Sequence, residues 1–129
     1  MNKRILVVED DKTLLEAIAF RLQQEGYETF TAEDGWEALN VIERKKIDLI
    51  ISDIMMPNIS GLSLLSVLNE FSIERIPVIV VSALDKADVI MSAMGLGAQD
   101  FIIKPINFDE LCTRITILLN KKQKAHALH

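Results

Sequence analysis

The stretch Ile5–Val8 (ILVV), followed at once by Glu9–Asp11 (EDD), decides the fold of this chain. A short apolar run rich in β-branched residues is typical of a strand buried on both faces, as strands are in a parallel sheet. The three acids then stand at the carboxyl end of that strand, where open α/β sheets bind their ligands. This stretch therefore predicts a parallel α/β sheet with a polar site at one edge.

Four further segments have the length and composition of strands. Three are apolar, whereas one alternates polar and apolar residues and suits an edge strand with one wetter face. Segments with helical spacing of apolar residues follow the strands, and Gly26 suits the end of the first. This order predicts a three-layer (βα)5 sandwich with helices on both faces of the sheet. The strand segments are Ile47–Ile51, Ile76–Val81, Phe101–Ile103 and the alternating Tyr27–Thr31, and the helices begin near Asp11, Asp34, Gly61, Asp85 and Asn107.

Composition limits the classes of protein that the chain fits. It has 129 residues, of which 50% are apolar, so it suits one domain with a real core. The formal net charge of −5 argues against binding of nucleic acid by bulk charge. The single cysteine, Cys112, excludes an intrachain disulfide and is compatible with a reducing cytoplasm. No apolar run approaches the length of a membrane span, so we expect a cytoplasmic protein that binds no membrane. From the net charge we expect no direct binding of nucleic acid by this domain.

Polar residues also follow the other apolar strands. Asp53 follows the third predicted strand, Ser82 the fourth and Lys104 the fifth. Taken alone, each polar residue has an ordinary explanation as a helix cap, a turn residue, a satisfied hydroxyl or a solvated lysine. Since the carboxyl ends of parallel strands share one edge of the sheet, we expect them to converge with Glu9 and Asp10 in one pocket.

Carboxylates this close repel one another, and a bound divalent cation removes that conflict. Oxygen ligands without a nearby His or Cys favour Mg²⁺, with Mn²⁺ as a substitute. An Asp carboxylate beside such a metal and a lysine is a competent nucleophile for phosphorus, because the two cations neutralise the phosphoryl oxygens. In-line attack by such a carboxylate gives an aspartyl phosphate.

These motifs together resemble the receiver-domain family of response regulators in two-component signalling. The resemblance runs from about Lys3 to Asn120, so residues 1–120 are expected to form the receiver domain and residues 121–129 a frayed tail or the start of a linker. It implies five parallel strands in the order 2-1-3-4-5, with helices on both faces. The motifs that carry it are Ile5–Asp11, Asp53–Gly61, Val80–Ala83 and Gly97–Pro105.

By this resemblance Asp53 is the phosphoacceptor. Mg²⁺ would be bound by Asp10, by Asp53 and by the backbone carbonyl of Met55. Glu9 would act on the metal through a bound water. Asp11 is next to the acidic pair, and we expect it to cap the first helix instead.

The resemblance also assigns the phosphate contacts and a switch. Ser82 would bond a phosphoryl oxygen, and Lys104 would pair with the phosphate. Movement of Ser82 would free space for Phe101 to turn inward, which would change the surface of the fourth helix, fifth strand and fifth helix. The bond between Lys104 and Pro105 is a candidate for the cis form.

The function implied is a phosphorylation-activated signalling switch and not an enzyme, apart from promoting its own phosphorylation and slow autodephosphorylation. A sensor histidine kinase or a phosphotransfer protein would supply the phosphoryl group, and the changed face would control a partner or an output domain. The chain would be either a stand-alone receiver or the N-terminal part of a longer regulator. Some apolar residues of the fourth helix are expected to form a contact surface for a partner or a second copy, because they cannot all face the core. They are Val89, Ile90, Met91 and Met94.

Met55 and Leu84 lie two residues after Asp53 and Ser82. In the family these positions flank the route of the water that hydrolyses the phosphate. Both side chains are apolar and cannot orient water, so we expect a fairly long-lived phosphoaspartate.

Two other functions fit parts of this pattern. A phosphohydrolase with an aspartyl nucleophile commonly has a second Asp two residues after the nucleophile, where this chain has Met55. A pseudo-receiver that never takes phosphate would not need the complete set of Glu9, Asp10, Asp53, Ser82 and Lys104. Incubation with Mg²⁺ and acetyl phosphate separates the three hypotheses.

Overall fold

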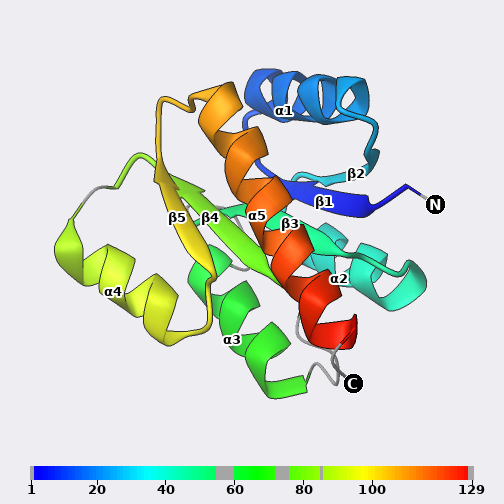
Figure 1. Ribbon diagram of the computed structural model, residues 1–129. Coiled ribbons are helices and arrows are strands. Elements are labelled where there is room, and N and C mark those ends of the chain that lie inside the picture. Colours follow the sequence, from blue (N-terminus) through cyan, green and yellow to red (C-terminus); the bar gives the residue numbers. More distant parts are fainter. Residues whose placement is uncertain (1, 55–59, 72–75, 85, 128–129) are drawn as a thin grey trace.

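The computed structural model describes residues 2–54, 60–71, 76–84 and 86–127. Within them strands alternate with helices from β1 to α5, as the sequence predicts (Figure 1). The elements are β1 (Arg4–Val8), α1 (Lys12–Gln24), β2 (Glu28–Ala32), α2 (Gly35–Arg44), β3 (Leu49–Asp53), α3 (Gly61–Phe71), β4 (Val78–Ser82), α4 (Ala87–Gly95), β5 (Asp100–Ile103) and α5 (Phe108–Ala127).

The strands form one parallel sheet in the order β2-β1-β3-β4-β5, which confirms the expected order. Helices α1 and α5 cover one face of the sheet, and α2, α3 and α4 cover the other (Figure 1). After β2 the chain crosses back over β1 to form β3, so the direction of strand addition reverses between β1 and β3. In open α/β sheets, ligands bind beyond the carboxyl ends of the strands at such a reversal.

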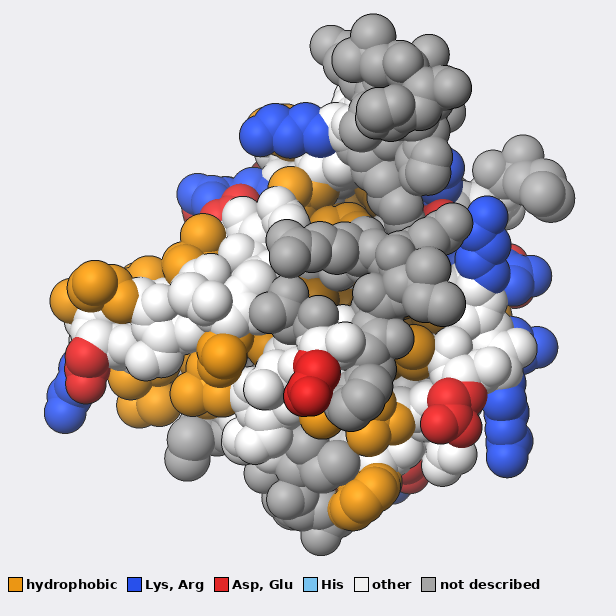
Figure 2. Space-filling model, turned by 90° about the horizontal axis from the view of Figure 1, so that it is seen from below, with side chains coloured by type: hydrophobic (Ala, Val, Ile, Leu, Met, Phe, Trp, Pro, Cys, Tyr) orange, Lys and Arg blue, Asp and Glu red, His pale blue; other side chains and the backbone are white. Residues whose placement is uncertain are grey.

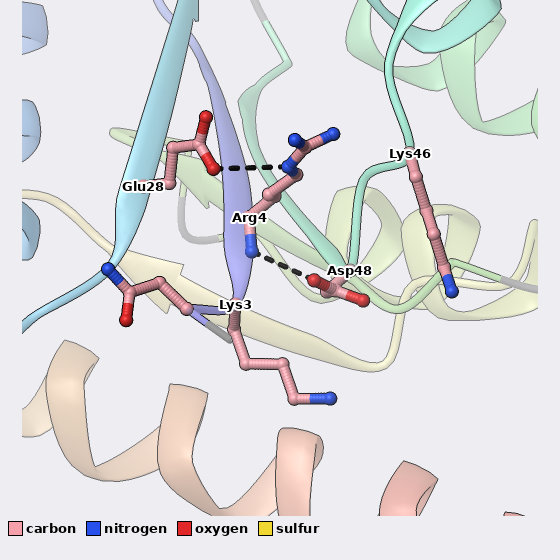
Figure 3. Close-up of a pocket in the computed structure, with 6 residues that line it drawn as sticks. Lys3, Arg4, Glu28, Lys46 and Asp48 are labelled. Carbon is pink, nitrogen blue, oxygen red and sulfur yellow. Dashed lines mark hydrogen bonds and ion pairs between the residues drawn. The ribbon is translucent and has the colours of Figure 1, made fainter.

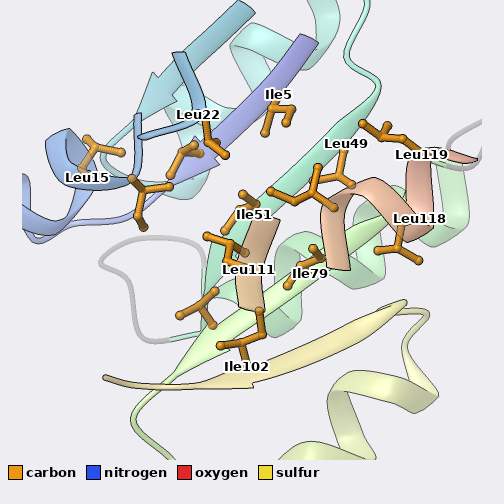
Figure 4. Close-up of a cluster of buried hydrophobic side chains, with 14 residues drawn as sticks. Ile5, Leu15, Leu22, Leu49, Ile51, Ile79, Ile102, Leu111, Leu118 and Leu119 are labelled. Atoms are coloured by element: carbon orange, nitrogen blue, oxygen red, sulfur yellow. The ribbon is translucent and has the colours of Figure 1, made fainter. Parts of the chain in front are cut away.

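The apolar run of β1 contributes side chains to two hydrophobic cores, one on each face of the sheet. Successive side chains of a strand point to opposite faces. Ile5 and Val7 therefore pack toward α1 and α5, whereas Leu6 and Val8 pack toward α2, α3 and α4. Figure 4 shows the first of these cores, in which aliphatic side chains fill the space between the sheet and helices α1 and α5. Every residue of the central strands β3 and β4 is buried, while the outer strand β2 is mostly exposed or half-buried, as its alternating sequence predicts.

Strands β3 and β4 begin later than their apolar runs suggest. Ile47 is buried but precedes β3. At Asp48, the side-chain carboxylate accepts a hydrogen bond of 2.8 Å from the backbone N–H of Arg4, and β3 begins at the next residue. Pro77 precedes β4, since proline has no N–H for the sheet ladder. Both strands then continue to the polar residue at their carboxyl end, Asp53 in β3 and Ser82 in β4.

The predicted helix caps are present where the structure describes them. The Asp11 carboxylate accepts hydrogen bonds from the N–H groups of Thr13 and Leu14, which confirms its role at the start of α1. Gly26 follows α1 with a φ of 92°, a left-handed conformation that suits glycine. Asp34 and Asn107 cap α2 and α5 through the N–H groups of the residues three positions further on. Asp85 itself lies outside the described residues, and α4 begins two residues later, at Ala87.

The segment expected to be a frayed tail or the start of a linker is helical over most of its length. Helix α5 continues past Asn120 as far as Ala127. The added residues are mainly Lys, Gln and Ala, which are good helix formers, and lysines near a helix C-terminus are stabilised by the helix dipole. The domain boundary at residue 120 stays a prediction. No helix among the described residues is long and apolar enough to span a membrane.

Candidate functional site

The polar residues that end the strands meet at one edge of the sheet. Glu9 follows β1, Asp53 ends β3, Ser82 ends β4 and Lys104 follows β5. The strand register aligns these ends, because Val8 pairs with Ser52, Asp53 with Val81, and Ser82 with Ile103. The backbone N–H of Lys104 donates to the carbonyl of Ser82 over 2.9 Å, which joins the last two ends directly.

Lys104 links two buried carboxylates. Its Nζ lies 2.8 Å from Oε1 of Glu9 and 2.7 Å from Oδ2 of Asp53. Glu9 is only 2% exposed and Asp53 only 6% exposed. Acids this deeply buried are rare unless they are paired or serve a metal or a reaction. The ammonium between them is thus part of the site and not the solvated surface lysine that Lys104 alone would suggest.

Three carboxylates gather at this edge. Glu9, Asp10 and Asp53 each place an oxygen within 4.8 Å of the other two, and Asp10 is exposed to solvent. Lys104 pairs with two of them, Glu9 and Asp53, so carboxylates outnumber the ammonium at this edge. A hard divalent cation with oxygen ligands fits this donor set and this charge, as the sequence predicts for Mg²⁺ or Mn²⁺.

The pocket shifts the pKa values of two of its groups. Burial raises the pKa of Glu9, and the charge of Asp53 adds to this, although hydrogen bonds from Lys104 and from the N–H of Asp11 oppose it. Burial acts to lower the pKa of Lys104, but its hydrogen bonds with Asp53 and Glu9 outweigh burial and raise the pKa overall. Lys104 therefore stays protonated at neutral pH and can pair with an anion.

Ser82 ends β4 next to Lys104, whereas Phe101 lies further back along β5, opposite Val80. Ser82 is fully buried, and its Oγ accepts a hydrogen bond from the N–H of Leu84 at 3.1 Å. Phe101 is half-buried and packs against the core on the α2–α3–α4 face. The peptide bond between Lys104 and Pro105 is cis, as predicted. Met55, which the resemblance assigns to the metal through its carbonyl, lies outside the described residues.

Gly61 and Ser52 contribute to the site in ways that the sequence reasoning missed. A Cβ on Gly61 would lie 2.2 Å from the carbonyl oxygen of Asp53, so only glycine lets α3 start this close to the acidic residue. The Ser52 hydroxyl donates to that same oxygen over 3.0 Å. The sequence carried a signal for both, since glycine ends the motif Asp53–Gly61 and Ser52 is polar within a strand that is otherwise apolar up to Asp53.

The opposite end of the sheet has a different character. A hollow of about 420 Å³ lies there, at the amino ends of β1, β2 and β3 (Figure 3). Three cations and two carboxylates line it, and Arg4 engages both carboxylates, Glu28 through Nε and Asp48 through its backbone N–H. The lining residues are Asn2, Lys3, Arg4, Glu28, Lys46 and Asp48. No residue of the predicted site is among them.

Helix α4 exposes part of its apolar sequence. Met91 is 73% exposed and Met94 is 44% exposed, while Val89 and Ile90 are half-buried. Figure 2 shows hydrophobic side chains gathered at the left of the molecule, where α4 lies. The expectation that these residues do not all face the core is confirmed.

The fold and site define a small parallel α/β domain with a lysine-bridged acidic pocket at the carboxyl edge of its sheet, and the comparisons with known proteins identify the family. The family model described as response regulator receiver domain matches residues 5–116. The chain belongs to the receiver-domain family of two-component response regulators, whose members are generally not enzymes.

Relatives and solved structures agree with this assignment. The chain is 33% identical over 97% of its length to the alkaline phosphatase synthesis transcriptional regulatory protein PhoP of Bacillus subtilis, covering 52% of that protein. It is 38% identical over 94% of its length to the response regulator GtcR of Aneurinibacillus migulanus, covering 49% of that protein. The chain thus spans about half the length of these relatives.

Two solved structures show the same fold over nearly the whole chain. The receiver domain of the Francisella response regulator 1452 has a TM-score of 0.89 and 37% identity, over 94% of this chain and 99% of that one. The signal receiver domain of a LuxO repressor protein from Vibrio parahaemolyticus has a TM-score of 0.93 and 32% identity, over 100% of this chain and 98% of that one.

Proposed function

We propose that this chain is a phosphorylation-activated switch that accepts a phosphoryl group on Asp53 from a histidine kinase or a phosphotransfer protein. The observation that carries the proposal is the ammonium of Lys104, held 2.7 Å from the buried Asp53 carboxylate and 2.8 Å from Glu9. A carboxylate next to a fixed cation, at the reversal point of a parallel sheet, is suited to attack phosphorus while the cation neutralises phosphoryl oxygens.

A magnesium ion, or manganese in its place, would be held by the carboxylates of Asp10 and Asp53. The carbonyl of Met55, outside the described residues, would complete the protein ligands. Both oxygens of Glu9 already accept hydrogen bonds, from Lys104 and from the N–H of Asp11, which supports a role for Glu9 through water and not as a direct ligand. When bound, the metal supplies charge neutralisation for the incoming phosphoryl group.

The reaction transfers one phosphoryl group between two residues. An oxygen of Asp53 attacks phosphorus and forms an acyl phosphate. The P–N bond of the phosphohistidine donor breaks, and its electron pair stays on the imidazole of the kinase. Lys104 then pairs with a phosphoryl oxygen in place of the carboxylate oxygen that it contacts now.

The new phosphate would change the state of the neighbouring strands. The Ser82 hydroxyl, which now accepts from Leu84, would turn to bond a phosphoryl oxygen. Phe101 would move from its half-buried position into the space released, and the surface of α4, β5 and α5 would change with it. The exposed Met91 and Met94 suit this surface to a partner, an output domain or a second copy of the chain.

We extend the proposal to a cytoplasmic setting, where histidine kinases present their phosphoryl groups. The relatives that are named transcriptional regulators support control of transcription as the output, and the chain spans about half of their length.

The experiment is incubation of the purified chain with acetyl phosphate and Mg²⁺, followed by intact-mass measurement. We expect the mass of one phosphoryl group to be added, and we expect no addition with EDTA or in Asp53→Asn. Turnover of many phosphoesters would support a phosphohydrolase instead. Absence of any modification in the wild type would support a pseudo-receiver and contradict the proposal.

The lifetime of the phosphate tests the role of its apolar neighbours. We propose that Met55 and Leu84 leave the hydrolytic water unoriented, so the phosphoaspartate decays slowly. Met55→Asn introduces an amide that can hold water, and its phosphate should decay faster than that of the wild type after acetyl phosphate is removed. Equal decay rates would contradict this role for Met55.

A further inference from the structure

Ser52 is a buried hydroxyl in the apolar layer under α2, α3 and α4. It is 1% exposed and lies in β3 on the same face as Ile50 and Ile54, both of which belong to the core on that side. A hydroxyl in such a place destabilises the fold unless it is hydrogen-bonded. Its bond goes to the carbonyl oxygen of Asp53, 3.0 Å away. The hydroxyl thus acts on the backbone of the proposed phosphoacceptor.

Gly61 also lies close to the peptide bond between Asp53 and Ile54. Its Cα approaches the Asp53 carbonyl so closely that a Cβ would lie 2.2 Å from that oxygen and 2.7 Å from the Cα of Ile54. The N–H of Gly61 also donates to the carbonyl of Ile54 over 2.8 Å. The start of α3 and the Ser52 hydroxyl therefore hold the peptide unit between Asp53 and Ile54 in one position.

The sheet register explains why this position benefits from extra restraint. The ladder between β1 and β3 ends at the pair of Val8 with Ser52. Asp53 lies one residue beyond that ladder and pairs only with Val81 of β4 among the strand partners. Contacts from Ser52 and Gly61 supplement the strand pairing where β1 no longer faces β3.

We propose that Ser52 is a positioning residue for phosphorylation, whose hydroxyl fixes the backbone that carries the Asp53 carboxylate; this inference rests on the proposed function. Transfer rates are sensitive to small displacements of the attacking atom, since the reacting groups must be held in a near-attack geometry. Loss of one neutral hydrogen bond that acts in this way lowers a rate about fivefold, because such a bond contributes on the order of 1 kcal/mol.

The test compares phosphorylation by acetyl phosphate, with Mg²⁺ saturating, in four forms of the chain. Ser52→Ala removes the hydroxyl at nearly constant volume. Ser52→Thr keeps it. Ile50→Val trims the same strand and face without touching a hydrogen bond, and so serves as the control for loss of stability alone. For each variant, the maximal rate and the acetyl phosphate concentration at half-maximal rate are measured separately.

We expect Ser52→Ala to lower the maximal rate about fivefold, with little change in the half-saturating concentration, because geometry and not donor binding is affected. Ser52→Thr and Ile50→Val should stay near the wild-type rate. If circular dichroism shows that Ser52→Thr does not fold, Ser52→Cys, which is similar in size and keeps a weak donor, takes its place with an intermediate rate expected.

Three results would overturn the inference. The first is a wild-type maximal rate in Ser52→Ala, and the second is an equal loss of rate in Ile50→Val. The third is a folded hydroxyl-bearing variant that is as slow as Ser52→Ala. In each of these cases the wild type is still phosphorylated, so the proposed function survives. A wild type that takes no phosphate would instead remove the proposed function together with the role of Ser52.

Discussion

The two ends of the sheet carry ion pairs of similar length in very different surroundings. At the carboxyl end, Lys104 contacts Glu9 and Asp53, whose side chains are 3% and 6% exposed. At the amino end, Arg4 contacts Glu28 at 3.1 Å, with side chains 38% and 47% exposed (Figure 3). Exposed pairs contribute little to stability, whereas buried acids are costly to desolvate unless they are well paired. Burial and not pairing distinguishes the end of the sheet that carries the candidate site.

The raised pKa of Glu9 reflects the cost of taking a carboxylate out of water, because burial disfavours its ionised form even beside Lys104. Two buried carboxylates around one ammonium, with the carboxylate of Asp10 close to both, are a costly arrangement for stability alone. The cluster is explained if a cation and a phosphoryl group complete it.

The largest loss of stability is expected from a substitution at Gly61, where the backbone of α3 approaches the site. Gly61→Ala places a Cβ 2.2 Å from the Asp53 carbonyl, and backbone cannot move aside as a flexible side chain can. We expect a loss of about 3 kcal/mol in the free energy of unfolding. Gly95→Ala is the matched control, since a Cβ there meets nothing within 4 Å and alanine favours the helix. Urea denaturation of both variants checks this, and equal stabilities would contradict the close approach.

The second largest loss of stability is expected at the carboxyl end of the sheet, from removal of the Lys104 ammonium. Lys104→Met leaves Glu9 and Asp53 buried without their cation, and we expect the metal-free chain to lose about 2 kcal/mol at neutral pH. Saturating Mg²⁺ should restore much of this loss, because the metal replaces the missing positive charge. A variant as stable as the wild type in EDTA would show that the lysine does not balance the acids.

A pH-dependent effect follows from Glu9. Its pKa in the folded chain is raised above the ordinary 4.5, so the folded state holds the proton more tightly than the unfolded chain. This contribution to stability is complete below about pH 4.5 and is lost as the pH rises through the folded-state pKa. In EDTA, Glu9→Gln should therefore gain stability relative to the wild type as the pH rises. Thermal denaturation across this range checks the sign, and a relative loss would contradict it.

The smallest effect belongs to the amino end. Arg4→Met breaks the exposed pair with Glu28 but keeps the backbone N–H that bonds Asp48. We expect a loss below about 1 kcal/mol, weakened further by salt, and no change in phosphorylation. A loss as large as that of Lys104→Met would remove the distinction between the two ends.

Much of the fold can be predicted from the sequence, because the apolar runs and helix caps mark the same elements that the sheet requires. The buried runs of β1, β3 and β4, the Asp11 cap and the convergence of strand ends are all readable from residue types. The order of the strands came from the family resemblance and not from the pattern. The late start of β3 follows a bond between distant residues, from the Arg4 N–H to the Asp48 carboxylate, which no local pattern shows. The late start of β4 was predictable, since Pro77 has no N–H for the sheet ladder.

The residue types and strand positions predicted which side chains form the site, but not the hydrogen bonds between them. Sequence order places Lys104 at a strand end, but the bond to both Glu9 and Asp53 depends on how far the strands extend. The roles of Ser52 and Gly61 were missed because one carbonyl oxygen links residues that are nine positions apart, through a contact that no local periodicity reports. The helical continuation to Ala127 was missed because charged helix formers resemble a solvated tail.

Chemical trapping of the phosphorylated residue offers the clearest decision on Asp53. After incubation with acetyl phosphate and Mg²⁺, borohydride reduces an acyl phosphate to an alcohol, which converts a phosphorylated aspartate into homoserine. Peptide mass spectrometry then identifies the converted position. We predict homoserine at position 53, dependent on Mg²⁺ and strongly reduced in Lys104→Met. Conversion at Asp10 or another acid, or no conversion anywhere, would contradict the assignment of Asp53 as the phosphoacceptor.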